Sequence, residues 1–328
     1  MYCSTVADIR RASAAHMASP PLADLSRLPR LHSVVLSDEM ETNEWKQLLE
    51  APPASAVELR QTLLARADTL SESVPCLAAK LEVDIVLSGC GFMVLYYLGV
   101  HSVLSRLEAR GCAKLHRFAG ASSGAKCPAQ LILAGEALTM DHHLAYGELC
   151  ERRGGSSIHA ACRNDRCARV TTDYLIAHYS RRLLDLDQRL FVCISQLTLL
   201  GPRRIVNSAF CDDKQPRVMQ RVREALHATG TLLTRLEGRG WYSDGANSGN
   251  SAASLSTAFG DSPRDQLYCE PQRCGLPKSM IFAYSVQQAV DAVRTGQDEI
   301  MALLESLAAG VEPPAGGALS LVRRAAAR

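Results

Sequence analysis

A unit made of an apolar strand, a glycine-containing turn and a helix occurs twice in this chain. In the first copy, the apolar residues of 83–87 lead into the turn Ser88-Gly89-Cys90-Gly91 and then a helical pattern from about Met93 to Ala109. In the second copy, a short strand around Arg117–Ala119 leads into Gly120-Ala121-Ser122-Ser123-Gly124 and a further helix. Successive strand-turn-helix units are typical of a parallel α/β sheet. We therefore predict an α/β fold with a central, mostly parallel sheet that is flanked by helices.

The composition divides the chain into four parts. Residues 1–40 mix Ala, Ser, Pro and Arg without a steady period and predict a poorly ordered extension. Residues 41–81 have apolar residues at helical spacing, interrupted by Pro52-Pro53, and predict two helices in front of the core. Residues 82–309 hold the α/β domain. The tail 310–328, rich in Ala, Gly and Pro, is expected to be disordered.

Beyond the second turn, the sequence predicts helices, a strand pair and a last strand. The helix after the second turn is expected to end at about Leu138. Further helices are expected at Thr139–Arg152, Thr172–Leu183, Gln215–His227 and Val286–Ala308. The expected strands are Leu190–Leu199, Arg203–Phe210 and Met280–Ala283. Gly201-Pro202 favours a direct connection between the first two of these strands.

The second turn fits the motif G-x-S-x-G through Gly120, Ser122 and Gly124. In this motif a sharp strand-to-helix turn exposes the serine hydroxyl, and the glycines permit a crowded backbone. The N-terminus of the following helix stabilises negative charge beside the serine. The motif is short and occurs by chance, but its place between a strand and a helix makes Ser122 a candidate nucleophile.

A nucleophilic serine needs a base. An α/β-hydrolase has its histidine late in the chain, but no histidine follows His227, so a triad in that order is disfavoured. The histidines that follow Ser122 fall on predicted helices or a helix end and are better interpreted as surface or structural residues; they are His142, His143, His159, His178 and His227. Ser243-Asp244-Gly245-Ala246 offers a carboxylate instead, either an ordinary turn aspartate or a base whose small neighbours allow close approach.

The first turn is a candidate oxyanion hole. The N–H groups of Gly89, Cys90 and Gly91 lie just before the predicted helix, where outward-facing amides can hold an oxyanion. The alternative is a turn with no chemical role.

A glycine-containing loop after the first strand, then G-x-S-x-G, then D-G-A far downstream resembles the patatin-like phospholipase family. Ser88-Gly89-Cys90-Gly91-Phe92 with Tyr97 and Gly99, and Gly120 to Ala125, look most like its lipid-droplet lipase and adiponutrin branch. The similarity covers roughly Val83 to Ala246. The chain departs from the family pattern at two positions. Many patatin-like proteins have a basic residue just after the glycine loop, where this chain has Met93, and a glycine in the middle of the loop, where this chain has Cys90.

This resemblance implies a three-layer fold and a serine lipid acyl hydrolase, a phospholipase A or acylglycerol lipase. Ser122 would be the nucleophile and Asp244 the base of a Ser-Asp dyad. The amides of Gly89, Cys90 and Gly91 would form the oxyanion hole, with no metal or organic cofactor. Phospholipids or acylglycerols would be the substrates, and the protein would contact a membrane or lipid droplet peripherally.

Three other functions stay open. An acyltransferase or transacylase would pass the acyl group from the same serine to an alcohol. A catalytically weak lipid-binding regulatory protein would keep the fold without turnover. A metal-binding interaction protein would use two C-x4-C pairs, Cys162 with Cys167 and Cys269 with Cys274, although this spacing is unusual for zinc.

The net charge and the pattern of cysteines indicate which partners and which cellular compartment to expect. The formal net charge is +2, with no long basic run, so nucleic-acid binding is not expected. Twelve cysteines without a C-x-x-C pair, and no N-x-[ST] sequon, favour mostly reduced thiols in a non-secreted protein. The apolar stretch Ile85–Leu104 includes a glycine turn and is better interpreted as buried core than as a membrane span.

We expect an intracellular protein, cytoplasmic or peripheral on a membrane or lipid droplet. The N-terminus lacks the apolar core of a signal peptide, and its arginines, serine and alanines only faintly resemble an organellar transit peptide.

Overall fold

The computed structural model describes residues 41–74, 80–154, 157–198, 201–207, 218–230, 234–236, 240–245, 250, 252–260, 262–281, 283–311 and 317–323. The chain divides into two units, Met1–Glu41 and Thr42–Arg328, and apart from Glu41 the described residues lie in the second. The predicted N-terminal extension, and Ala246 of the D-G-A motif, lie outside the described residues.

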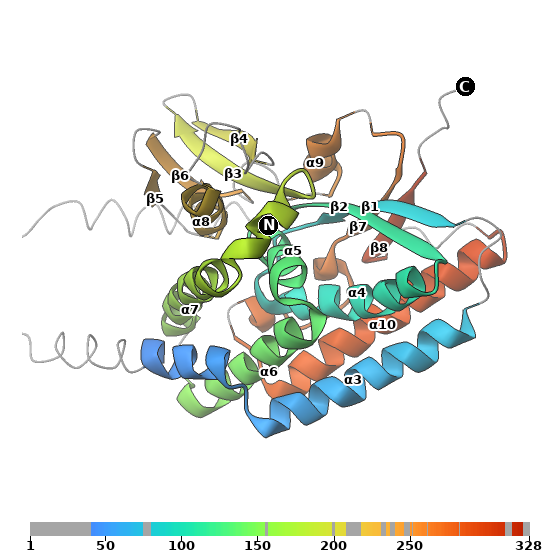
Figure 1. Cartoon of the computed structure of the whole chain (residues 1–328), viewed down its shortest axis with the longest axis horizontal. Coiled ribbons are helices and arrows are strands. Elements are labelled where there is room, and N and C mark those ends of the chain that lie inside the picture. The colour runs from blue at the N-terminus through green and yellow to red at the C-terminus, as the bar shows by residue number, and fades with distance from the viewer. Residues whose placement is uncertain are drawn as a thin grey trace, which may run out of the picture. The chain divides into compact units, whose positions relative to one another are not determined.

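The described strands form one mixed sheet of eight strands (Figure 1). They are β1 (Leu81–Leu87), β2 (Ala113–Ala121), β3 (Leu190–Thr198), β4 (Gly201–Asn207), β5 (Thr234–Leu236), β6 (Gly240–Asp244), β7 (Asp265–Cys269) and β8 (Leu319–Val322). Their order is β5-β6-β3-β2-β1-β7-β8, and β4 also pairs with β3. The predicted α/β class is confirmed.

The centre of the sheet is parallel, whereas its margins are antiparallel. Strands β3, β2, β1 and β7 run parallel to one another. Strands β4 and β6 pair antiparallel with β3, β5 with β6, and β8 with β7. The expectation of a mostly parallel sheet therefore holds for the centre only. The two strand-turn-helix units build that centre, while hairpin-type pairing adds the outer strands.

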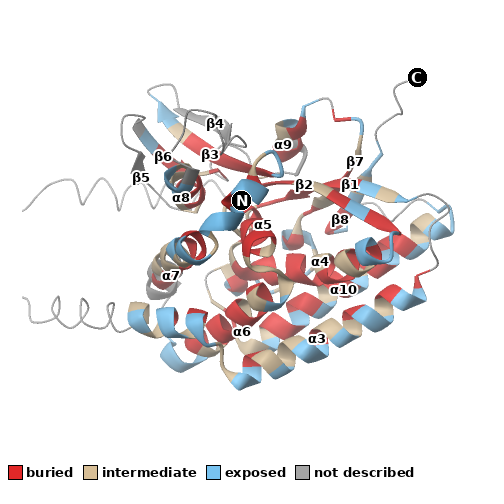
Figure 2. Ribbon diagram, viewed as in Figure 1, coloured by how far each residue is buried: buried red, intermediate tan, exposed pale blue. Residues whose placement is uncertain are grey.

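Helices cover the sheet and bury its main apolar core. They are a helix at 41–50, α3 (Ala54–Ser73), η2 (Gly91–Met93), α4 (Val94–Ala109), α5 (Ser123–Ala134), α6 (Glu136–Arg153), α7 (Ser157–His178), η3 (Ser180–Leu186), α8 (Val218–Ala228), α9 (Ala252–Ser256), η5 (Thr257–Phe259), η6 (Pro271–Arg273), η7 (Lys278–Ile281) and α10 (Val286–Ala308). Figure 1 shows α4, α10, α6 and α3 gathered on one side of the sheet. Figure 2 shows that their buried faces point inward and that the outer face of α3 is exposed.

The helices predicted in front of the core are packed into it. Leu63 and Ala67 of α3 belong to the main apolar cluster. The Gln297 side chain of α10 donates to the carbonyl of Leu63 at 2.9 Å and accepts from Arg66 at 2.7 Å. Because α3 and α10 are joined in this way, residues from Ala54 onward are part of the α/β unit rather than a separate preface.

A smaller apolar cluster covers the other face of the sheet. Its members are Val86, Ala119, Ala121, Phe191, Cys193, Leu255 and Phe259. The last two come from α9 and η5. Arg117 of β2 lies at this face, where its Nε donates to the fully buried Asp84 at 2.9 Å and its guanidinium carbon lies 4.7 Å from the Phe259 ring centroid.

Several predicted elements are wrong in place or kind. The strand predicted at Met280–Ala283 lies partly in the 3-10 helix η7, and the seventh strand is Asp265–Cys269. The tail predicted to be disordered contains β8, which pairs with β7 and buries Leu319. Both strands are only four or five residues long, so their stability comes from partners distant in sequence, and local periodicity does not mark them.

Candidate active site

Ser122 occupies a strained turn between β2 and α5. Strand β2 ends at Ala121, α5 begins at Ser123, and Ser122 between them has φ 54° and ψ −130°. Among the described residues other than glycine, only Ser122 and Gln188 have a positive φ. Such a backbone costs about 1–3 kcal/mol and persists only where the surroundings enforce it. The turn therefore has the strained strand-to-helix geometry that G-x-S-x-G predicts.

The two glycines of this motif are required by close packing of the backbone. A Cβ on Gly120 would lie 2.1 Å from the carbonyl oxygen of Gly124. A Cβ on Gly124 would lie 2.4 Å from the carbonyl oxygen of Leu87, at the end of β1. Any larger residue would force these segments apart, so the motif holds the first and second turns against each other.

A threonine from outside the motif holds the backbone of Ser122. The fully buried Thr229, just after α8, accepts the Ser122 N–H at 2.8 Å through its hydroxyl. The same hydroxyl donates to the carbonyl of Cys193 at 2.7 Å. Sequence reasoning missed Thr229, because nothing in the local pattern marks a contact across 107 positions.

Asp244 ends a strand that meets the end of β2. Strand β4 pairs with β3 over Val192–Thr198 and occupies one edge of it. Strands β2 and β6 must then share the other edge, where Ala121 pairs with Cys193 and Asp244 with Ile194. Because β2 runs parallel and β6 antiparallel to β3, the carboxyl ends of β2 and β6 face each other. Their partners on β3 are adjacent residues, which are about 3.3 Å apart along a strand.

Gly245 extends this junction toward the nucleophile. A Cβ on Gly245 would lie 2.0 Å from the carbonyl oxygen of Cys193 and 3.1 Å from the Cβ of Ala121. Only glycine fits there, so the D-G pair follows from packing against the end of β2. The half-buried Ser122 hydroxyl makes no hydrogen bond to any described residue, including Asp244.

The glycine loop lies directly beside Ser122, and two of its three N–H groups already have acceptors. A Cβ on Gly89 would lie 2.9 Å from the Cβ of Ser122. The Gly89 N–H donates to Oδ1 of Asn250 at 2.5 Å, and the Cys90 N–H donates to Oγ of Ser123 at 3.2 Å. Of the three predicted donors, only the N–H of Gly91 has no acceptor among the described residues.

Lys126 brings a positive charge into the site. It lies one turn into α5, and a Cβ on Gly230 would be 2.0 Å from its Nζ. Burial lowers the pKa of Lys126, while the carboxylates of Asp244 and Asp165 oppose that effect. The ammonium group therefore lies within electrostatic range of Asp244. No motif pointed to this lysine.

None of the histidines with described side chains hydrogen-bonds to Ser122. His142 bonds to the carbonyl of Leu49, His143 to Gln130 and His178 to the carbonyl of Tyr174, and His227 lies 3.7 Å from Asp173. The side chain of His159 lies outside the described residues. These partners agree with the structural role expected for these histidines.

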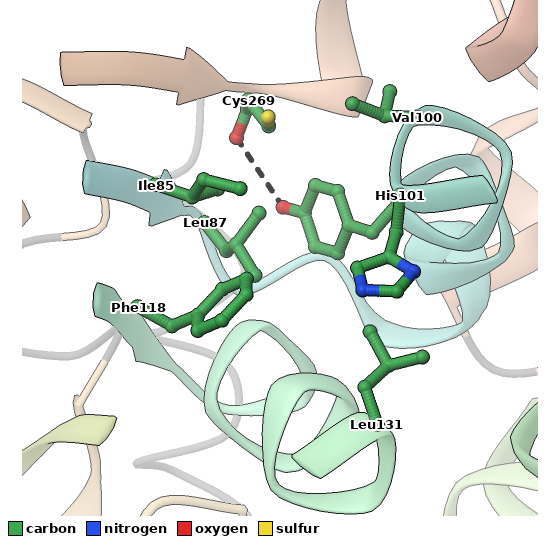
Figure 3. Close-up of a pocket in the computed structure, with 8 residues that line it drawn as sticks. Ile85, Leu87, Val100, His101, Phe118, Leu131 and Cys269 are labelled. Atoms are coloured by element: carbon green, nitrogen blue, oxygen red, sulfur yellow. Dashed lines mark hydrogen bonds between the residues drawn. The ribbon is translucent and has the colours of Figure 1, made fainter. Parts of the chain in front are cut away.

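A small apolar cavity lies between the sheet and α4 (Figure 3). Its lining residues are Ile85, Leu87, Tyr97, Val100, His101, Phe118, Leu131 and Cys269. The Tyr97 hydroxyl donates to the carbonyl of Cys269 at 3.3 Å. Neither Ser122 nor Asp244 lines this cavity, so we do not assign it an acyl chain.

The cysteines with described side chains form no disulfide, with one exception. Thiols are found at Cys90, Cys127, Cys150, Cys167, Cys193, Cys269 and Cys274, whereas Cys112 is disulfide-bonded. Burial raises the pKa of Cys90 to about 12 and that of Cys274 to about 11. Protonated thiols are poor metal ligands, and no group of three or more metal-ligating side chains occurs among the described residues. The side chain of Cys162 lies outside them.

Comparisons with known proteins do not assign the chain to a family. No family model, no curated protein and no solved structure matches the chain. Within the described part of the chain, no helix has the length and apolar character needed to cross a bilayer.

Proposed function

We propose that the protein is a serine lipid acyl hydrolase that uses Ser122 as nucleophile and Asp244 as base. The observation that carries the proposal is the strained Ser122 backbone at the point where the carboxyl ends of β2 and β6 meet. Strain of this kind concentrates at functional sites. Gly89, Gly124 and Gly245, one from each motif that resembles the patatin-like family, pack around this point, which supports a patatin-like, three-layer arrangement.

The proposed reaction consists of two acyl transfers, first from the ester to Ser122 and then from Ser122 to water. Oγ of Ser122 attacks the ester carbonyl carbon while Asp244 accepts the hydroxyl proton, and a tetrahedral oxyanion forms. The bond to the leaving alcohol breaks, and Asp244 returns the proton to that alcohol. Water then attacks the acyl-enzyme, with Asp244 again accepting and returning a proton, and a fatty acid leaves. The Gly91 amide of the glycine loop and the backbone amides of the α5 N-terminus stabilise the oxyanion.

Two exposed apolar residues beside the dyad support a lipid surface as partner. Gln196 of β3 pairs with Tyr242 of β6, and Leu197 and Trp241 are the next residues on the two strands. Their side chains are 41% and 49% exposed. Trp241 lies three positions before Asp244, and tryptophan prefers the boundary between water and lipid. We assign this pair the peripheral contact with a membrane or lipid droplet.

The test is hydrolysis of short-chain and long-chain esters and of a phospholipid by wild type, Ser122→Ala and Asp244→Asn. Loss of activity in both variants, with circular dichroism unchanged, is the expected result. A fluorophosphonate probe should label wild type but not Ser122→Ala. Unchanged activity in either variant contradicts the dyad. Product analysis with an added alcohol acceptor separates hydrolysis from transacylation.

One observation favours a second candidate, a lipid-binding protein with weak turnover. The Gly89 and Cys90 amides already have acceptors, which leaves fewer donors for an oxyanion. In that case wild type would bind phospholipid vesicles but react with neither the esters nor the probe.

A further inference from the structure

The carboxamide of Asn250 is paired with both polar atoms of Gly89. Its Oδ1 accepts the Gly89 N–H at 2.5 Å, and its Nδ2 donates to the Gly89 carbonyl at 2.6 Å. Two bonds between one side chain and one residue fix both the position and the orientation of that residue. Gly89 lies beside the Ser122 Cβ, so Asn250 acts on the part of the loop nearest to the nucleophile.

Gln272 supports the same residue from a second side. Its Nε2 donates to the Gly89 carbonyl at 2.7 Å, and its Oε1 accepts the Ser88 hydroxyl at 3.0 Å. The Gly89 carbonyl therefore has two donors, whereas the Gly89 N–H depends on Asn250. Loss of Gln272 leaves the pairing with Asn250 in place, but loss of Asn250 leaves the N–H without its acceptor.

We propose that Asn250 is a positioning residue that holds the Gly89-Cys90-Gly91 loop against Ser122. This inference rests on the proposed function. Asn250 follows Asp244 by six positions, so one stretch of chain supplies both the proposed base and the residue that fixes the oxyanion loop. In this arrangement Gly89 anchors the loop, and the Gly91 N–H is the loop donor left for the oxyanion.

The physical effect of Asn250 is on the transition state. An unpaired, partly buried N–H is energetically unfavourable, so the loop would move to regain a partner. A displacement of about 1 Å in a catalytic group can reduce the rate about 100-fold. In this proposal Gly89 acts at the oxyanion and not on the acyl chain of the substrate. Loss of Asn250 should therefore lower kcat and leave KM nearly unchanged.

The experiment compares Asn250→Ala with Gln272→Ala in the full chain, with a phospholipid and a long-chain ester as substrates. Asn250→Ala should lower kcat about 100-fold with KM within about threefold, and should slow fluorophosphonate labelling of Ser122 to a similar extent. Gln272→Ala should lower kcat less than about tenfold. Asn250→Asp has the same size but places a carboxylate oxygen against the Gly89 carbonyl oxygen, where Nδ2 donates in wild type. Because these two oxygens repel each other, Asn250→Asp should also lower kcat, and it provides a second variant if Asn250→Ala fails to fold.

The outcomes separate this inference from the proposed function. If wild type is active and labelled, and the Asn250 variants fold with unchanged kcat and labelling rate, the positioning role is wrong and the dyad stands. A higher kcat in Asn250→Ala would also overturn it, because Asn250 would then obstruct the oxyanion site. If wild type is neither active nor labelled, the proposed function itself fails.

Discussion

Ala121 and Asp244 occupy neighbouring positions on one edge of β3, paired with Cys193 and Ile194. Two strands that approach from opposite directions end at the same point. The residue after Ala121 is Ser122, so the candidate nucleophile and base meet although 122 positions separate them in the sequence. A mixed sheet permits this junction, because a purely parallel sheet has no strands that meet end to end.

The strain at Ser122 predicts an unusual effect of glycine. Ser122→Gly should have a higher free energy of unfolding than Ser122→Ala by about 1 kcal/mol, because relief of about 1–3 kcal/mol of strain exceeds glycine's entropic cost of about 0.5–1 kcal/mol. Chemical denaturation measures this difference. Ser123, which begins α5, is the matched control, and there glycine should be less stable than alanine. The same order at both positions would show that Ser122 is not strained.

The sequence predicted the parts of the site that lie in short motifs. Gly120, Ser122 and Gly124 form a strand-to-helix turn within five residues, and Asp244-Gly245 is a local pair, so composition and spacing could point to them. Their roles in catalysis stay predictions. The α/β class was also predictable, because two strand-turn-helix units restrict the fold strongly.

The contacts that hold these motifs together could not be predicted. Thr229 lies 107 positions from Ser122, Asn250 lies 161 from Gly89, and Gln272 lies 183 from Gly89. Each is a single polar residue in a region without a motif. Such contacts depend on the order of strands in the sheet, which local periodicity does not specify. The same reason explains why β7 and β8 were missed.

Thr229 should matter for both stability and rate. Thr229→Val keeps the shape but removes the hydroxyl that accepts the Ser122 N–H and donates to the Cys193 carbonyl, so the free energy of unfolding should fall by about 2 kcal/mol. Ester hydrolysis should also slow, because the turn at Ser122 loses the hydrogen bond that holds its backbone. Thr229→Ser keeps the hydroxyl and should retain most of the activity. If Thr229→Ser loses as much activity as Thr229→Val, packing of the methyl group is responsible instead.

Lys126 should influence the pH dependence of the reaction. Burial lowers the pKa of Lys126, and the Asp244 carboxylate opposes this lowering; by reciprocity the Lys126 ammonium favours the charged form of that carboxylate. Lys126→Met should therefore move the acidic limb of the kcat/KM profile to higher pH. Lys114→Met, at an exposed position on β2, is the control and should leave the limb in place. A limb that is identical in Lys126→Met and wild type would show that the two charges do not interact.

His142 should make the fold sensitive to acid. Burial lowers its pKa to about 4, against an unperturbed value of 6.5, and its bond to the Leu49 carbonyl only partly opposes this. Its Nδ1 is buried without a partner among the described residues, so a proton there has no acceptor. Between pH 6.5 and about 4 the unfolded chain binds more protons than the folded one at this residue. The free energy of unfolding should therefore fall as the pH falls through this window, by about 3 kcal/mol in total.

Urea denaturation at several pH values between about 4 and 7 measures this loss. His142→Gln does not titrate, and its amide can still donate to the Leu49 carbonyl, so its stability should change much less across the window. His178→Gln, at an exposed position on α7, should follow wild type. If His142→Gln loses stability as steeply as wild type does, then the acid sensitivity comes from other groups, and His142 does not have the depressed pKa that its burial implies.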